Sequence, residues 1–143
     1  MQLDFYKIGT INEEELRFAV ISAIYQNKWV YVRQKDRTTW ETPGGHRDLG
    51  EAIIRTAKRE LFEETGAVRI EIVPICDYSL NDSSGKRFGR LFFSTIIELD
   101  QLPDSEINEV NFFEMLPRNL TYAEIQPRLF EKTIEFLNAK EGS

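Results

Sequence analysis

The sequence predicts an α/β fold in which a mixed β-sheet lies between helices. Segments with the residue pattern of strands alternate with segments that have the pattern of helices, as expected for such a layered architecture. At 143 residues the chain has the length of one domain and can bury a substantial core. No internal repeat, linker or low-complexity tract divides it, so residues 1–143 are predicted to form a single domain.

The first predicted strands form a hairpin. Residues 18–25 and 28–33 are rich in apolar and aromatic residues, and Gln26 and Asn27 between them predict a tight turn. A polar loop then leads to residues 40–42, a short extended segment that enters a Pro-Gly-Gly turn.

A helix is predicted after this turn, over residues 52–65, which contain good helix formers and no proline. Asp48 and Glu51 have the spacing of a capping box at its start. Gly66 is placed to end it, since glycine favours the left-handed conformation that commonly follows a helix.

The second half of the chain predicts an extended hairpin. Residues 68–80 are rich in Val and Ile and read as a strand bent at Pro74. Residues 81–89 are predicted as a polar loop and residues 90–99 as a second long strand. A further short strand is expected over residues 110–113.

The last predicted element is a helix that ends near residue 139. Thr121 and Glu124 have capping-box spacing and predict its start. Pro127 fits this prediction because proline is tolerated in the first turn of a helix.

The predicted helix over residues 52–65 carries an unusual acidic cluster. At about 100° per residue, Glu60 and Glu64 fall on the edge of its apolar stripe, and Glu63 follows about 60° further round. Carboxylates beside an apolar face are costly unless their charge is compensated, and a hard cation bound by oxygen ligands would compensate it. Arg59 lies one turn before Glu63 and is predicted to pair with it. The apolar stripe consists of Ile53, Ile54, Ala57 and Leu61.

The alternative interpretation is an ordinary amphipathic helix with a solvated acidic face. That interpretation explains neither the position of Glu60 and Glu64 beside the core stripe nor the Pro43-Gly44-Gly45 turn that precedes the helix. A divalent-cation site next to a bound diphosphate explains both features.

Residues 45–67, GHRDLGEAIIRTAKRELFEETGA, resemble the signature box of the Nudix hydrolases at every specified position. Two mild departures are Asp48, where many members have Glu, and Ala67, where the family often has a larger aliphatic residue. The resemblance implies an α/β/α sandwich. It also implies hydrolysis of a nucleoside diphosphate linked to another group, giving a nucleoside monophosphate and the phosphorylated group.

The resemblance further implies a metal site. Glu60, Glu63 and Glu64 would bind Mg²⁺, with Mn²⁺ as the alternative, and the carbonyl of Gly45 would complete the site. Glu63, Glu64 and Arg59 are therefore predicted catalytic residues, and Glu51 would act through water or support the loop. For the base that takes a proton from the attacking water, the family offers Glu64 itself or a later glutamate. Glu106 and Glu109 are the later candidates, and a surface charge on a turn is the equal alternative for each.

Three further residues are predicted to bind substrate. Arg33, at a position often basic in the family, is a candidate phosphate ligand, and a solvated charge at a strand end is the equal alternative. Trp40 is a candidate for stacking on a base, although packing is the more common role of such a residue. His46, the only histidine, is a candidate phosphate contact or a solvated loop residue.

Composition and charge limit the kinds of molecule that the protein is expected to bind. The net charge of −6 argues against nucleic acid, since no basic stripe matches a phosphate backbone. Cys76 is the only cysteine, so no internal disulfide forms, which favours a reducing, cytoplasmic location, and Cys76 is predicted to pack in the core. No signal peptide and no membrane-spanning apolar run are found. A small-molecule nucleotide is the expected partner, and a homodimer is suggested because many members of the family dimerise.

The sequence leaves three hypotheses: a hydrolase of nucleotides, a nucleotide-sensing module, and a metal-binding helical domain of unrelated fold, against which the strand-rich flanks speak. Residues 81–89 lack the marks of several subgroups of the family, including the ADP-ribose and dinucleoside polyphosphate hydrolases. Elimination leaves a nucleoside triphosphate, oxidised or not, as for the MutT-like members. The alternative is a nucleotide-sensing module without catalysis, although such modules tend to lose the glutamates that are all present here.

Overall fold

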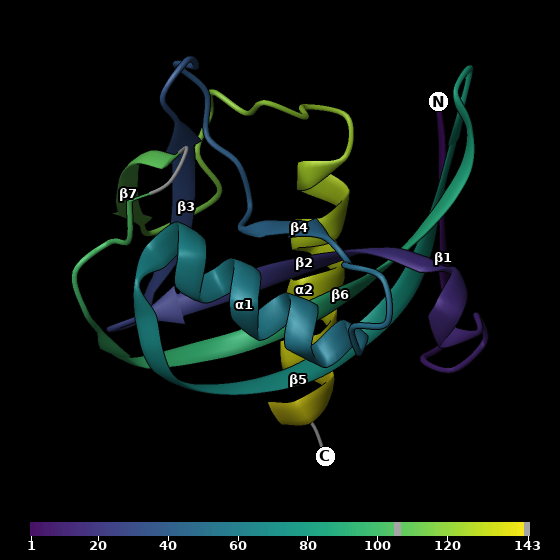
Figure 1. Ribbon diagram of the computed structural model, residues 1–143, viewed down its shortest axis with the longest axis horizontal. Coiled ribbons are helices and arrows are strands. Elements are labelled where there is room, and N and C mark those ends of the chain that lie inside the picture. Colours follow the sequence, from purple (N-terminus) through teal and green to yellow (C-terminus); the bar gives the residue numbers. More distant parts are fainter. Residues whose placement is uncertain (105–106, 142–143) are drawn as a thin grey trace.

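A computed structural model of the chain describes residues 1–104 and 107–141. Its strands form one sheet with the order β1-β5-β6-β2-β3-β7, and β4 pairs with β2 beside this path (Figure 1). Strands β2 and β6 run parallel whereas the other pairs are antiparallel, so the predicted mixed sheet is confirmed. The elements are, in chain order, β1 (Gln2–Tyr6), η1 (Glu13–Glu15), β2 (Leu16–Tyr25), β3 (Lys28–Gln34), β4 (Gly44–His46), α1 (Ile53–Thr65), β5 (Ala67–Asp82), β6 (Gly85–Leu99), β7 (Ile107–Phe113) and α2 (Gln126–Glu141).

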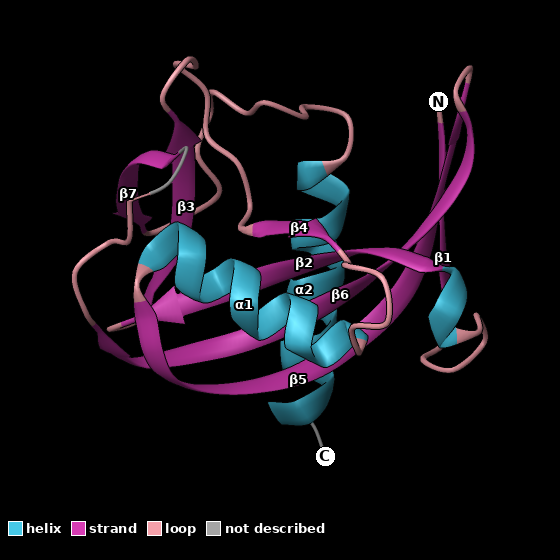
Figure 2. Ribbon diagram, in the orientation of Figure 1, coloured by secondary structure: helices cyan, strands magenta, loops and turns pink. Residues whose placement is uncertain are grey.

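The two long helices cover opposite faces of the sheet, as the predicted sandwich requires (Figure 2). Side chains along a strand alternate between its faces, and β2 shows this directly. Ala19 and Ile21 pack in one core cluster with Leu61 of α1. Ser22, the residue after Ile21, points to the other face of the sheet, where its hydroxyl forms a hydrogen bond with that of Thr133 of α2. Each helix therefore has its own layer of buried contacts with the sheet.

The β2–β3 hairpin is confirmed. Gln26 and Asn27 have φ values of 51° and 67°, and positive φ at both central residues matches the right-handed twist of paired strands.

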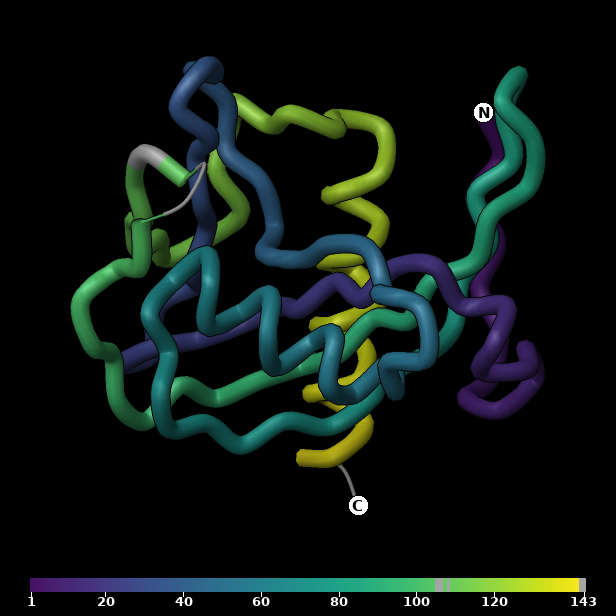
Figure 3. The backbone as a smooth tube through the Cα atoms, viewed as in Figure 1, coloured from purple at the N-terminus to yellow at the C-terminus, as the bar shows by residue number. Residues whose placement is uncertain are grey.

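The β5–β6 hairpin is longer than predicted. The strands continue through most of the segment expected to be a loop, and Asp82 pairs with Gly85. The prediction of a loop over residues 81–89 is therefore wrong. The polar residues in this segment are common in turns, but they also occur in solvent-exposed antiparallel strands, and here they do. This paired end extends away from the helices, with β1 alongside it (Figure 3). The register shift between Pro74 and Cys76 confirms the predicted irregularity.

Helix α1 begins later than its predicted capping box. Its N-cap is Ala52, with no side-chain cap. The Glu51 carboxylate does accept the Asp48 N–H at 3.1 Å, but this bond closes a loop turn and not the helix. Gly66 ends the helix in the left-handed conformation with φ 81°, as predicted.

Helix α2 begins at Gln126, so the capping box predicted at Thr121 and Glu124 is wrong. The side-chain oxygen of Gln126 reaches back and accepts the Tyr122 N–H at 2.8 Å. Pro127 lies in the first turn, as predicted. None of the helices among the described residues is long and apolar enough to cross a membrane.

Cys76 packs in the second core cluster, with Leu3, Leu91 and Leu129, which confirms the prediction of a core role. Burial raises the pKa of its thiol to about 11. The thiolate, which is the reactive form of cysteine, is therefore scarce at neutral pH.

The buried hydroxyl pair between β2 and α2 gives a test of how this helix is held. The Ser22 Oγ and Thr133 Oγ1 atoms are 2.7 Å apart. We expect Thr133→Val to lower the free energy of unfolding by about 1–3 kcal/mol, because the Ser22 hydroxyl stays buried without its partner. Urea denaturation measures this change. The double variant Ser22→Ala/Thr133→Val should recover part of the loss, and additive losses would contradict the pairing.

Candidate active site

Strand β4 brings the glycine turn against both β2 and α1. Gly44 and Gly45 pair with Val20 and Ala19 of β2. A Cβ atom added to Gly45 would overlap the carboxylate of Glu60. Any larger residue at this position would displace the Glu60 carboxylate from its present place. The predicted proximity of Gly45 to the acidic cluster is therefore found in the structure.

Arg59 joins the loop before α1 to the helix. Its guanidinium donates to Glu51 at 2.8 and 2.9 Å, to Glu60 at 2.7 Å, and to the carbonyl of His46 at 3.1 Å. The predicted pairing with Glu63 is the weakest of these contacts, at 3.5 Å. Arg59 therefore orients chiefly Glu51 and Glu60. The predicted pairing with Glu63 is present, but helical spacing could not predict the closer contact with Glu51, because Glu51 precedes the helix.

Glu51 supports the loop, one of the two roles predicted for it. Besides Arg59, its carboxylate accepts the Thr56 hydroxyl at 2.7 Å and the Asp48 N–H. The hydrogen bond from Arg59 is the first cause of its low pKa, about 2. Glu51 therefore stays ionised at any physiological pH and holds Arg59 in place.

Glu60 and Glu64 lie where helical spacing places them, at the edge of the core. Burial raises the pKa of Glu60, and it raises that of Glu64 to about 8. One oxygen of Glu64 accepts the Gly44 N–H at 3.0 Å. Its other oxygen has no hydrogen-bond donor among residues 1–104, 107 and 109–141. A positive charge beside these carboxylates would stabilise their ionised forms.

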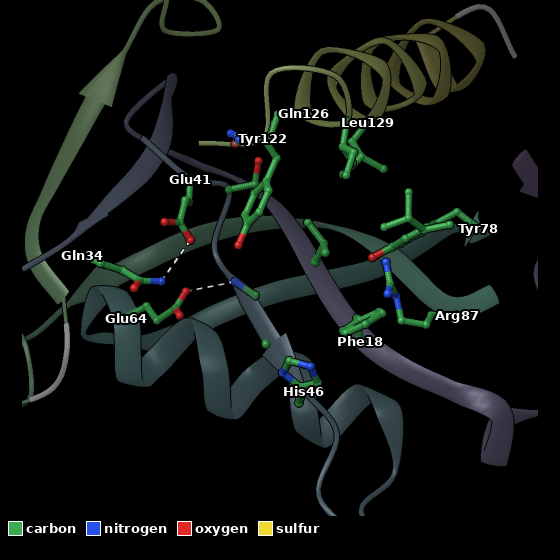
Figure 4. A pocket seen from close by; sticks show the side chains of 16 residues that line it. Phe18, Gln34, Glu41, His46, Glu64, Tyr78, Arg87, Tyr122, Gln126 and Leu129 are labelled. Carbon is green, nitrogen blue, oxygen red and sulfur yellow. Dashed lines mark hydrogen bonds between the residues drawn. The ribbon is translucent and has the colours of Figure 1, made fainter. Parts of the chain in front are cut away.

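A cavity of about 470 Å³ opens beside Glu64 and the glycine turn (Figure 4). The turn and β2 form one side, the ends of β5 and β6 a second, and the start of α2 the third. The lining residues are Phe18, Val20, Gln34, Glu41, Thr42, Gly44, Gly45, His46, Glu64, Tyr78, Leu80, Arg87, Tyr122, Ile125, Gln126 and Leu129. Such a volume lies in the range of small-molecule sites.

The predicted substrate ligands divide between two places. His46 lines the cavity, with its ring 4.8 Å from that of Phe18. Arg33 instead donates to Glu109 at 2.7 Å and lies over the ring of Trp40. The cavity lining does not include Arg33, Trp40 or Glu109. The other predicted base, Glu106, lies outside the described residues.

Most cavity residues escaped the sequence analysis, among them Glu41 and Gln126. Glu41 is only 8% exposed, and Gln126 only 3%. Neither has a strong sequence signal: Glu41 is one charged residue in the short extended segment before the glycine turn, and Gln126 falls within the predicted last helix. Both reach the cavity only because the segment before the glycine turn folds against the segment before α2.

The chemistry of the acidic cluster fits a divalent cation. Carboxylate oxygens and a backbone carbonyl are hard ligands of the kind that Mg²⁺ prefers, and the half-buried glutamates need a compensating charge. Within the described ranges, no three acidic, histidine or cysteine side chains already converge as a ready-made cluster. One oxygen of the Glu60 carboxylate accepts a hydrogen bond from Arg59, which fixes the orientation of this carboxylate.

The sequence model of the NUDIX domain family matches residues 15–133 of the chain. The chain therefore belongs to the Nudix hydrolase family, and it is an enzyme of the class that acts on nucleoside diphosphate derivatives. No curated protein sequence matches the chain significantly.

Solved structures of low sequence identity share the fold. The Bacillus subtilis pyrophosphohydrolase BsRppH has a TM-score of 0.80 at 20% identity, covering 93% of this chain and 90% of that one. A UDP-X diphosphatase has a TM-score of 0.75 at 20% identity, covering 94% of this chain and 68% of that one. An Ap4A hydrolase of C. elegans has a TM-score of 0.68 at 20% identity, covering 86% and 99%. These likenesses confirm the α/β sandwich.

Proposed function

We propose that the chain is a Mg²⁺-dependent pyrophosphohydrolase. Its substrate is a nucleoside triphosphate, oxidised or not, which it cleaves to a monophosphate and diphosphate. The observation that carries this proposal is the half-buried Glu64, which faces a nucleotide-sized cavity beside the glycine turn. A diphosphate placed at this wall of the cavity would bring its charge beside Glu60, Glu63 and Glu64, and a shared cation would compensate both.

The side chains have separate roles in this proposal. Glu60, Glu63 and Glu64 hold the cation together with the carbonyl of Gly45. Mg²⁺ bound there would withdraw charge from the phosphate oxygens and acidify water, with Mn²⁺ as a substitute. Glu64 takes the proton of the attacking water, and this role is supported by its place on the cavity wall, where the Gly44 N–H holds one of its oxygens. Arg59 positions Glu60, and His46 contacts the phosphates from the cavity wall.

Arg33, Trp40 and Glu109 receive no direct role in this proposal. Arg33 and Glu109 neutralise each other, and Trp40 packs against Phe113 at a ring distance of 5.1 Å. We propose that this group stiffens the β3–β7 edge, whose strands pair along their length.

The role of Arg59 can be tested by Arg59→Lys. Lysine keeps the charge but cannot hold Glu51 and Glu60 with one planar fork. We expect kcat/KM to fall about 10–100-fold, as for other residues that orient a metal ligand. Higher Mg²⁺ should recover part of the loss, because the variant weakens cation binding. A loss of the same size at every Mg²⁺ concentration would contradict a positioning role.

The proposed reaction is tested with a substrate panel. Purified protein with Mg²⁺ is offered the four nucleoside triphosphates, oxidised guanine nucleotides, ADP-ribose, a dinucleoside polyphosphate and a UDP-sugar. Products are separated and identified. Release of diphosphate from a triphosphate is the expected result. Cleavage of only ADP-ribose or another diphosphate compound would overturn the substrate class. Tight binding of one of these compounds without turnover would favour the alternative function, a nucleotide-sensing module without catalysis.

We further propose that the chain acts as one domain in the cytoplasm on a free nucleotide and not on nucleic acid. Its net charge of −6 and its single, buried cysteine support this. A homodimer is proposed only because many members of the family dimerise, and sedimentation of the purified protein would test it.

A further inference from the structure

Glu41 places a carboxylate on the cavity wall opposite the ends of β5 and β6 (Figure 4). One of its oxygens accepts the Gln34 amide at 3.2 Å, and the other accepts the Thr121 hydroxyl at 3.2 Å. Arg37 lies 3.7 Å from the second oxygen. A carboxylate oxygen can accept two hydrogen bonds, so both oxygens can still accept from a ligand.

Gln126 contributes a donor to the same wall. Its side-chain oxygen accepts the Tyr122 N–H, whereas its Nε2 atom is buried and has no hydrogen-bond partner in the part of the chain that the structure describes. Buried donors in folded proteins are nearly always paired, so an unpaired one beside a cavity marks a place for a ligand acceptor.

Neighbouring residues hold these two side chains near each other. Thr121 bonds to Glu41, and the next residue, Tyr122, bonds to Gln126. Tyr122 is exposed, and its ring lies between them on the cavity wall (Figure 4). The wall therefore presents two acceptor atoms, one donor and an aromatic face on which a planar ring can stack.

We propose that this wall binds a guanine base, with Glu41 as the residue that determines base specificity. The Watson–Crick edge of guanine carries two adjacent N–H donors next to a carbonyl oxygen. The donors match the two oxygens of Glu41, and the carbonyl matches the amide nitrogen of Gln126. Adenine and cytosine place a ring acceptor beside their single amino group, which a carboxylate repels, and uracil has one donor between two carbonyls. The inference rests on the proposed nucleotide hydrolysis and names its substrate class as guanine nucleotides.

The test compares kcat/KM for GTP, ITP and ATP with Mg²⁺. Inosine lacks the exocyclic amino group, so ITP offers Glu41 one donor where GTP offers two. We expect the wild-type protein to prefer GTP over ATP about tenfold or more, the discrimination typical of a bidentate pair, with ITP between them. Glu41→Gln should bring the GTP:ATP ratio to within about threefold. The GTP value should fall, because the amide can accept at one position only, and the ATP value should hold or rise, because the amide no longer repels the ring acceptor of adenine.

Two further variants complete the experiment. Glu98→Gln removes the same charge from an exposed position at the end of β6, outside the cavity, and should leave the ratio unchanged. Gln126→Glu replaces the donor by an acceptor and should also reduce the preference for GTP. Melting curves establish that each variant is folded. If Glu41→Gln does not fold, Gln126→Glu and the binding of GMP and AMP to the wild-type protein decide the question.

The outcomes separate the two proposals. Hydrolysis of nucleotides without preference for guanine, or an equal loss of GTP and ATP hydrolysis in folded Glu41→Gln, overturns the assignment of Glu41 while the proposed reaction stands. If no nucleotide is hydrolysed, the proposed reaction fails. In that case GMP binding at least about tenfold tighter than AMP, lost in Glu41→Gln, still supports the base site, and equal binding overturns it.

Discussion

Replacing Glu64 by Gln is expected to lower kcat at least about 100-fold. The variant loses a negative ligand of the proposed cation and the proposed proton acceptor, and each of these effects is worth a factor of this order. The fold should survive, because a glutamine oxygen can still accept the Gly44 N–H. Burial already disfavours the charged form of Glu64, whose pKa is raised to about 8. Without metal, the melting temperature of the variant should therefore equal or exceed that of the wild-type protein.

Steady-state kinetics at saturating Mg²⁺ and thermal melting check this prediction. Glu71→Gln, at an exposed position on β5, removes the same charge away from the cavity and should change neither quantity. A folded Glu64→Gln variant with near-normal kcat would show that Glu64 is neither ligand nor base. The same substitution at Glu63 is expected to lower activity through the metal alone, so a higher Mg²⁺ concentration should rescue it more fully.

Gly45→Ala is expected to lower kcat/KM about 100-fold or more. The added methyl group occupies the space of the Glu60 carboxylate, so either Glu60 or β4 must move. A displacement of about 1 Å in a catalytic group can cost this much. Overpacking should also lower the free energy of unfolding by about 1–3 kcal/mol.

A second glycine separates lost geometry from lost stability. Gly9 has φ 89° and open space around it, so Gly9→Ala strains the backbone without a steric contact. We expect Gly9→Ala to lose a similar 1–3 kcal/mol of stability and to keep full activity. Equal activities for the two variants would contradict the close approach of Gly45 and Glu60.

Helical periodicity explains why part of the site was predictable. The positions of Glu60 and Glu64 at the core edge follow from the spacing of residues on one helix, and the structure has both carboxylates there. Gly66 was predictable for the same local reason, since a left-handed residue ends the helix. The capping boxes failed because their spacing also occurs in loop turns, as at Asp48 and Glu51.

The remaining cavity residues could not be predicted from local patterns. Glu41 and Gln126 are 85 positions apart in the chain and meet through the bond of Thr121 to Glu41 and that of Gln126 to Tyr122. Arg33 was predicted to bind phosphate because its position is often basic in the family. Pairing of β3 with β7 instead sets it opposite Glu109, with which it forms an ion pair. Only the tertiary fold decides such contacts.

The contacts of Arg59 have a consequence for the energetics of binding. The guanidinium ties the loop after β4 to α1 through Glu51 and the His46 carbonyl, with no ligand present. The conformational entropy of that loop is therefore already lost when the protein folds. Binding of a nucleotide therefore does not have to order this loop, and a larger part of the free energy of the contacts appears as affinity. In calorimetry, a variant that frees the loop should bind with a more unfavourable entropy than the wild-type protein.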